Sequence, residues 1–145
     1  MMVNHIRNLT IGLILIVSLS SCNFFGTSGN ASSNCEDDFL GVRMTPPEGV
    51  TVVSERCRMG FNAQASMELT FPPSLLDAVV ESSRVVEVHD TIPDGTNIDL
   101  LPVDPNQFDS FLVGMYSDGA YLIDLVIDTS NGTEYRAWYE NTFID

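Results

Sequence analysis

The chain has 145 residues, of which 20 are acidic and only six are basic, so its formal net charge at pH 7 is −14. All six basic residues are arginines, and lysine does not occur. This excess of negative charge disfavours binding to nucleic acids and to anionic lipid headgroups, and it favours cationic ligands or basic protein surfaces. The same acidity is also typical of proteins adapted to high salt, where ions screen the repulsion between like charges.

The first residues of the chain contain a short apolar segment, Leu9 to Leu19, preceded by His5 and Arg7. A helix that spans a bilayer needs about 20 apolar residues, so this segment is too short to cross one and is typical of a signal peptide. The segment runs directly into Leu19-Ser20-Ser21-Cys22, in which two small residues precede a cysteine.

This arrangement resembles the signal peptide of bacterial lipoproteins, and the resemblance ends at Cys22. It implies cleavage of residues 1–21, a covalent diacylglycerol on Cys22 with acyl lipid such as palmitate, and attachment to a membrane of the cell envelope through that lipid. Asn23 stands where an Asp would retain such a protein at the inner membrane, which favours the outer membrane in a cell that has one. The alternative is an ordinary secretory signal peptide with an unrelated cysteine.

The remainder of the chain is long enough for one domain with a core of its own. Residues 22–34 are rich in Gly, Ser, Asn and Thr and are predicted to form a flexible tether, and residues 35–145 a single extracytoplasmic domain. Two cysteines remain after lipidation of Cys22. Because thiols exported to an oxidising compartment pair, Cys35 and Cys57 are predicted to form a disulfide.

Two strands and one helix are predicted in the first half of this domain. A turn with Pro46, Pro47 and Gly49 precedes the first strand, residues 50–55. Residues 64–71 alternate strictly between apolar and polar side chains, which indicates a half-buried strand. Ser74 and Asp77 then have the spacing of a capping box, so a helix is predicted from Ser74 to Ser83.

The middle of the domain is predicted to be less regular. Residues 84–89 are predicted to form a strand, and residues 98–103 follow a Pro-Asp-Gly turn as an extended segment. Asp104 and Pro105 have the pattern of a helix cap followed by proline at the first helical position, which predicts one short helical turn.

The last 35 residues predict an antiparallel meander of three strands, residues 111–116, 120–128 and 133–140. Two-residue Asp-Gly and Asn-Gly turns are common in hairpins, but here they would mix apolar and charged side chains on each face. Loops of three residues would place the apolar side chains on one face and the charged ones on the other. A register shift of one residue would move every side chain of a strand to the opposite face. We therefore expect three-residue loops and one apolar face: Phe111, Val113, Met115, Tyr121, Ile123, Leu125, Ile127, Tyr135, Ala137 and Tyr139.

The opposite face of this meander is the predicted binding surface. An amphipathic aromatic residue with polar neighbours is a common recognition anchor, so Trp138 and Tyr116 could stack on a sugar or grip a peptide. Asp124, Asp128 and Glu140 would receive cationic groups, and Arg136 lies on the same face. Alternatively, other elements cover this face and Trp138 belongs to the core.

The sequence contains no recognisable catalytic motif. His89 is the only histidine after the signal peptide, Gly-x-Ser-x-Gly is absent, and without lysine there is no Schiff base. No His or Cys cluster fits zinc. Two sets of oxygen ligands could form an irregular calcium site: Asp94, Asn97 and Asp99, or Asp128, Asn131 and Glu134. The alternative is that these residues serve the turns in which they lie.

We therefore expect an α+β domain with an antiparallel sheet of about five to seven strands and one main helix on one side, or alternatively a β-sandwich. The expected function is that of a membrane-tethered, non-enzymatic binding, inhibitory or assembly module of the envelope, with a protein or glycan partner. The alternatives are a small carboxylate-dependent hydrolase of envelope polymers and a calcium-stabilised surface or adhesion module.

Overall fold

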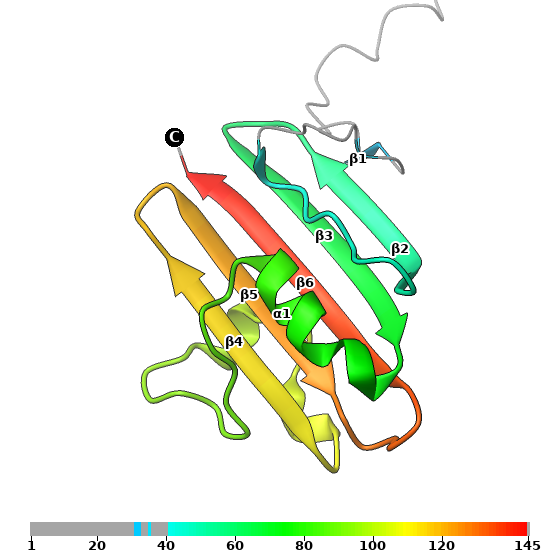
Figure 1. The fold of residues 1–145 in the computed structure, drawn as a ribbon. Helices are drawn as coiled ribbons and strands as arrows, with labels where there is room; N and C mark the ends of the chain where they lie inside the picture. Colours follow the sequence, from blue (N-terminus) through cyan, green and yellow to red (C-terminus); the bar gives the residue numbers. More distant parts are fainter. Residues whose placement is uncertain (1–30, 33–34, 36–40, 145) are drawn as a thin grey trace, which may run out of the picture.

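The computed structural model describes residues 31–32, 35 and 41–144, which form one antiparallel six-stranded sheet in the spatial order β1-β2-β3-β6-β5-β4 (Figure 1). The elements in chain order are β1 (Ala31–Ser32), β2 (Thr51–Arg58), β3 (Asn62–Phe71), a 3₁₀ turn (Pro73–Leu75), α1 (Leu76–Ser83), two further 3₁₀ turns (Ile98–Leu100 and Pro105–Gln107), β4 (Phe111–Ser117), β5 (Tyr121–Asp128) and β6 (Tyr135–Ile144). The predicted α+β class, with a C-terminal meander and one main helix, is confirmed.

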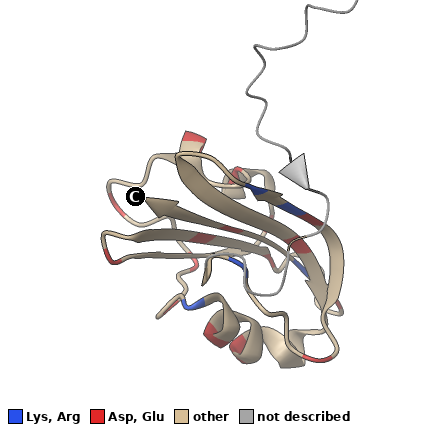
Figure 2. Ribbon diagram, turned by 90° about the horizontal axis from the view of Figure 1, so that it is seen from above, with Lys and Arg blue, Asp and Glu red and all other residues tan. Residues whose placement is uncertain are grey.

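Helix α1 packs on one side of the sheet, which we call the helix face (Figures 1 and 2). The alternation predicted for residues 64–71 places the apolar side chains of β3 on this face, and the strand begins two residues earlier than expected. The core joins these side chains to those of β5, β6 and α1: Met67, Leu69, Phe71, Val79, Ile123, Leu125, Ile127, Ala137 and Tyr139. The hydroxyl of buried Tyr139 donates a hydrogen bond to the carbonyl oxygen of Val42 at 3.0 Å.

The predicted capping box does not form. Ser74 lies in the 3₁₀ turn that precedes the helix, and α1 begins at Leu76 without a side-chain hydrogen bond at its N-cap, Leu75. Pro72 and Pro73 explain the shift, because proline at the start of the 3₁₀ turn sets the backbone geometry there without a cap. The helix ends as predicted at Ser83, and Arg84 adopts the left-handed conformation with φ 67°.

After α1 the chain passes around the β4 edge of the sheet, and the strand predicted for residues 84–89 is reduced to a single bridge. Only His89 pairs with the sheet, through two hydrogen bonds with Val113 of 2.9 and 2.8 Å. The side chains of Val85 and Val88 instead pack over Gly114, where an added methyl group would lie 2.4 and 2.9 Å from them. Glycine is therefore required at residue 114 because the segment crosses β4 so closely.

The predicted register of the β4–β5 hairpin is wrong. Asp118 faces Tyr121 across a tight turn, with its carboxylate accepting hydrogen bonds from the N–H groups of Ala120 and Tyr121 at 2.9 and 2.8 Å. Tyr116 consequently pairs with Ile123 and Met115 with Asp124. The side chains of β4 are therefore inverted relative to the prediction: Leu112, Gly114 and Tyr116 belong to the helix face, and Phe111, Val113 and Met115 to the other.

The β5–β6 hairpin has the predicted faces but a longer connection. The last pair of the hairpin is Asp128 with Arg136 and β6 begins at Tyr135, so residues 129–134 connect the two strands instead of the three residues predicted. The pairing register differs from the predicted one by two residues. An even shift keeps each side chain on its face, so Ile127 and Ala137 still share the helix face.

The side of the sheet away from α1, which we call the outer face, is also partly covered. Residues 90–110 cross it, and the segment predicted to be extended contains a 3₁₀ turn instead. Leu101 packs there with Val113 and Val126, and all three are buried. The turn predicted at Asp104 is confirmed, with its carboxylate accepting from the N–H of Asn106 at 2.9 Å. Val113 of β4 and Val126 of β5 are therefore buried on the outer face as well, in addition to the core on the helix face.

The predicted disulfide between Cys35 and Cys57 is present, with the two Cα atoms 5.5 Å apart. Ala31 and Ser32, in the range expected to be a tether, pair with Arg58 and Cys57 as the edge strand β1. The predicted signal peptide and Cys22 lie outside the described residues. Within the described part of the chain, no helix is long and apolar enough to span a bilayer.

Candidate functional site

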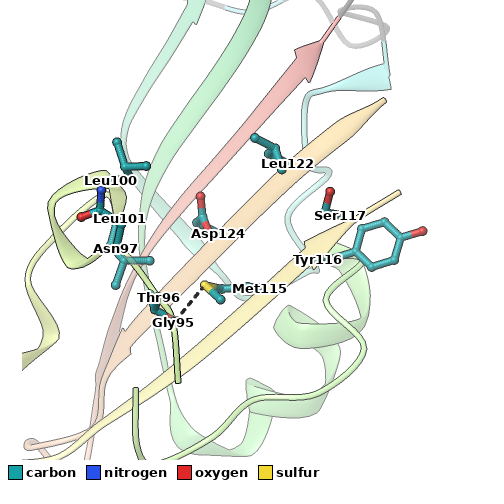
Figure 3. A pocket seen from close by; sticks show the side chains of 10 residues that line it. All are labelled: Gly95, Thr96, Asn97, Leu100, Leu101, Met115, Tyr116, Ser117, Leu122 and Asp124. Carbon is teal, nitrogen blue, oxygen red and sulfur yellow. Dashed lines mark hydrogen bonds between the residues drawn. The ribbon is translucent and has the colours of Figure 1, made fainter. Parts of the chain in front are cut away.

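The outer face carries four of the five side chains that the sequence selected for binding. Asp124, Asp128, Arg136 and Trp138 alternate with the core residues of β5 and β6 and lie on this side of the sheet. Tyr116 is separated from them, because the corrected β4 register packs it against the core on the helix face. Figure 3 shows its ring turned away from the other residues of the site.

Trp138 is half-buried and is held between two neighbours. The ring of Phe108 stacks on it with a centroid distance of 5.2 Å and an interplanar angle of 16°. The guanidinium of Arg136 lies 5.2 Å from the centroid of its ring and forms an ion pair with Glu68 on β3. The indole therefore presents only part of its surface to a ligand, and Phe108, directly after the 3₁₀ turn at Pro105–Gln107, supplies the cover.

A hollow of about 520 Å³ lies on the outer face, between residues 95–101 and the strands β4 and β5. Its floor consists of Met115, Leu122 and Asp124, and Leu100 and Leu101 form its wall (Figure 3). Leu100, Met115 and Leu122 are exposed by 70, 40 and 42%, so an apolar ligand could still cover them. Thr96 donates a weak hydrogen bond to the sulfur of Met115 at 3.8 Å.

Asp124 is the charged side chain of this hollow, and its environment opposes ionisation. Burial raises the pKa of Asp124 to about 6, and the negative charge of Glu140 adds to the effect. Glu140 pairs with Asp124 across β5 and β6, and its carboxylate accepts a hydrogen bond from the side-chain amide of Gln64 at 2.7 Å. A carboxyl group in an apolar hollow that titrates near neutral pH is a feature of functional sites.

A smaller hollow of about 190 Å³ lies beside the first on the same face. Trp138, Glu140 and Glu68 line it from the sheet, together with Arg56 of β2, and Pro102 borders it from the covering segment. Asp124 lines the larger hollow and Glu140 lines the smaller one, and the two residues are direct neighbours across β5 and β6. The outer face thus has three neighbouring features: an apolar hollow, a pair of acidic residues and a half-covered aromatic ring.

The wall of the larger hollow was not predicted from the sequence. Leu100 and Leu101 were predicted to be extended, whereas Asn97 caps a 3₁₀ turn by accepting the N–H of Asp99 at 3.2 Å. An Asn two residues before an Asp, followed by two leucines, was the available signal for a turn with an apolar edge.

Three of the six side chains considered for calcium, those of Asn97, Asp128 and Asn131, accept hydrogen bonds in turns. Asp128 accepts from the N–H of Ser130 at 2.9 Å, and Asn131 accepts from the N–H of Thr133 at 3.0 Å. Among residues 31–32, 35 and 41–144, no cluster of three or more His, Cys, Asp or Glu side chains could hold a metal ion. His89 lies 3.1 Å from Glu87 at the β4 edge, away from both hollows.

The chain was compared with protein-family models, with curated proteins and with solved structures, and none of them matches it.

Proposed function

We propose that this protein is a non-enzymatic binding module of the bacterial envelope, anchored to a membrane by a lipid on Cys22. Its ligand is the basic segment of an envelope protein, which inserts a cationic side chain into the hollow at Asp124. The single observation that carries this proposal is the position of Asp124, a half-buried carboxylate at the floor of a largely apolar hollow.

The chemistry of the hollow fits an alkyl chain that ends in a cation. Leu100, Met115 and Leu122 would cover the methylene groups of a lysine or arginine side chain, because such chains bury their stems in apolar surroundings. The charged end would reach Asp124, and Glu140 beside it would add to the attraction. At pH 7 Asp124 is mostly ionised, since its pKa of about 6 lies below that pH.

The overall charge of the protein supports a basic partner. The net charge of −14 attracts basic surfaces at long range and speeds their association. Figure 2 shows acidic residues on the helix, on the sheet and in the turns, with few basic segments between them. Weak, charge-steered binding of this kind should decrease as the salt concentration rises.

The proposal is tested by crosslinking in cells. A photoreactive amino acid at residue 122, which is exposed at the edge of the hollow, should capture an envelope protein in the lipidated chain. Asp124→Asn should reduce that capture at least tenfold, and Glu134→Gln should leave it unchanged, because Glu134 is an exposed acid in the β5–β6 turn. Equal capture in both variants would overturn the role of Asp124.

A second candidate is the carboxylate-dependent hydrolase of envelope polymers, because the Asp124–Glu140 pair favours it specifically. A carboxyl group with a pKa near 6 can donate a proton to a leaving group near neutral pH, while a neighbouring ionised carboxylate stabilises positive charge. Purified protein should then cleave cell-wall glycan or peptide, and Asp124→Asn should abolish the cleavage. If cleavage is absent while capture depends on Asp124, the binding function is favoured.

A further inference from the structure

The turn between β2 and β3 is the most exposed apolar site among the described residues. We call residues Met59, Gly60 and Phe61 the tip. The side chain of Phe61 is 88% exposed and that of Met59 is 55% exposed. Ile144, which pairs with Asn62 next to the tip, is exposed by 39%. No neighbouring element within the described part of the chain covers these side chains, and their exposure to water is unfavourable.

The tip lies at the end of the sheet from which the chain leads back to the proposed lipid. Ala31 of β1 pairs with Arg58, the residue directly before Met59. Cys22 precedes Ala31 by nine residues, a length whose r.m.s. span is about 17 Å for a flexible chain and at most about 30 Å when extended. A lipid on Cys22 therefore holds the tip within a short distance of the bilayer surface.

We propose that the tip inserts Phe61 and Met59 into the headgroup region of the bilayer that carries the Cys22 lipid, so that the strands stand upright on the membrane. This inference rests on the lipid anchor of the proposed function. A lipid chain and a second, apolar contact together hold a protein on a membrane far more firmly than either alone. Arg56 and Arg58 are exposed beside the tip and suit a surface of phosphate groups.

This orientation has a consequence for the hollow on the outer face. Tyr121 pairs with Phe143 at the same end of the sheet, and Asp124 follows it by three residues along β5, a distance of about 10 Å. The hollow would therefore open sideways just above the headgroups, where it meets partners that are themselves held at the membrane.

The test uses the full lipidated chain in vesicles of dioleoylphosphatidylcholine, with a nitroxide on a single introduced cysteine. Gly60→Cys places the label in the tip and keeps Phe61 and Met59, since the nearest atom to an added Cβ is 3.9 Å away. Gly132→Cys is the matched control in the β5–β6 turn at the other end of the sheet, where nothing lies within 4 Å. The remaining cysteines carry lipid or form the disulfide, so each variant has one labelling site.

We expect the label at residue 60 to be several-fold less accessible to aqueous nickel, relative to oxygen, than the label at residue 132. Phe61→Ser with Met59→Ser should abolish that difference without preventing flotation with the vesicles. Flotation with equal accessibility at both labels would overturn the orientation alone. Failure to float would overturn the lipid anchor and the orientation together. Shielding of residue 60 in unlipidated Cys22→Ala protein without vesicles would show that a second copy covers the tip, which also overturns the proposal.

Discussion

Asp124 on β5 lies directly opposite Glu140 on β6, on the outer face of the sheet. Like charges in register across two strands repel each other, so this pair costs the sheet stability that a neutral pair would not. Gln64 relieves part of the cost by donating a hydrogen bond of 2.7 Å to Glu140, whereas Asp124 faces the apolar hollow. The hollow therefore contains a carboxyl group, that of Asp124, which is mostly ionised at pH 7 and whose charge changes near pH 6.

Replacement of Glu140 by Gln should lower the pKa of Asp124 from its value of about 6. The Coulomb repulsion is removed, but burial, which is the larger cause, remains, so the pKa should stay above the ordinary value of 3.8. A titration of the side-chain carbonyl carbons by NMR measures this shift. Glu134→Gln is the control and should leave the titration of Asp124 unchanged; an equal shift there would refute the pairing.

Replacement of Asp124 by Asn should stabilise the protein at alkaline pH and have little effect in acid. The pKa of Asp124 is about 6 in the folded protein and near 3.9 in an unfolded chain, so the folded state holds this proton more tightly. The stability that this gives is present in full below about pH 4 and is lost as the pH rises to about 6. Urea unfolding should show Asp124→Asn more stable by about 1 kcal/mol at pH 8, after allowance for partial solvation, and similar to the wild type at pH 4.

Gly114→Ala should destabilise the domain by about 1–3 kcal/mol. The added methyl group would lie 2.4 Å from Val85, 2.9 Å from Val88 and 3.0 Å from the backbone oxygen of Glu87. Because a backbone atom is among them, the segment after α1 must move as a whole. Gly132→Ala is the control, since its methyl group would meet nothing within 4 Å. Equal thermal midpoints for the two variants would contradict the close crossing over β4.

Removal of the disulfide by Cys35→Ser with Cys57→Ser should lower the free energy of unfolding by about 3–4 kcal/mol, because the bridge restricts the unfolded chain. The bridge also fixes the start of the domain to β2. Reducing agent should lower the thermal midpoint of the wild type to that of the double variant. Cys22→Ala is the control, and its midpoint should not change, because Cys22 lies outside this pair.

Trp138→Ala should destabilise the domain by about 2 kcal/mol, less than for a fully buried aromatic residue, because Trp138 is half-buried. Trp138→Phe keeps a ring against Phe108 and should lose less than half of that amount. Chemical unfolding monitored by circular dichroism measures both. A loss of partner capture in Trp138→Phe, with stability retained, would assign Trp138 to the binding surface; unchanged capture would assign it to packing alone.

The β4 register shows where sequence reasoning failed. The prediction gathered the apolar residues of all three strands on one face of the meander, and the burial of that face was expected to select the register. In the structure residues 84–88 cover β4 on one side and residues 95–108 cover it on the other. When both faces of a strand are buried, hydrophobic alternation no longer selects a register, and the turn at Asp118 decides it.

The candidate site was predictable only in part. Asp124 and Trp138 could be assigned to one face because β5 and β6 alternate regularly. The hollow could not be predicted, because it depends on where Leu100 and Leu101 return to the sheet from a segment without periodicity. The raised pKa of Asp124 depends on the same segment, because burial is the larger cause of the shift and Leu100 and Leu101 line the hollow around this carboxyl group.

The sequence by itself determined the elements whose physical cause is local: the alternating strand β3, the helix after two prolines and the turn at Asp104. It also predicted the disulfide between Cys35 and Cys57. The tertiary structure alone decided the features that depend on distant segments: the order of the strands, the inversion of β4, the cover on both faces and the charge state of Asp124. The physical reason is that periodicity and capping act over a few residues, whereas burial depends on which segments meet in space.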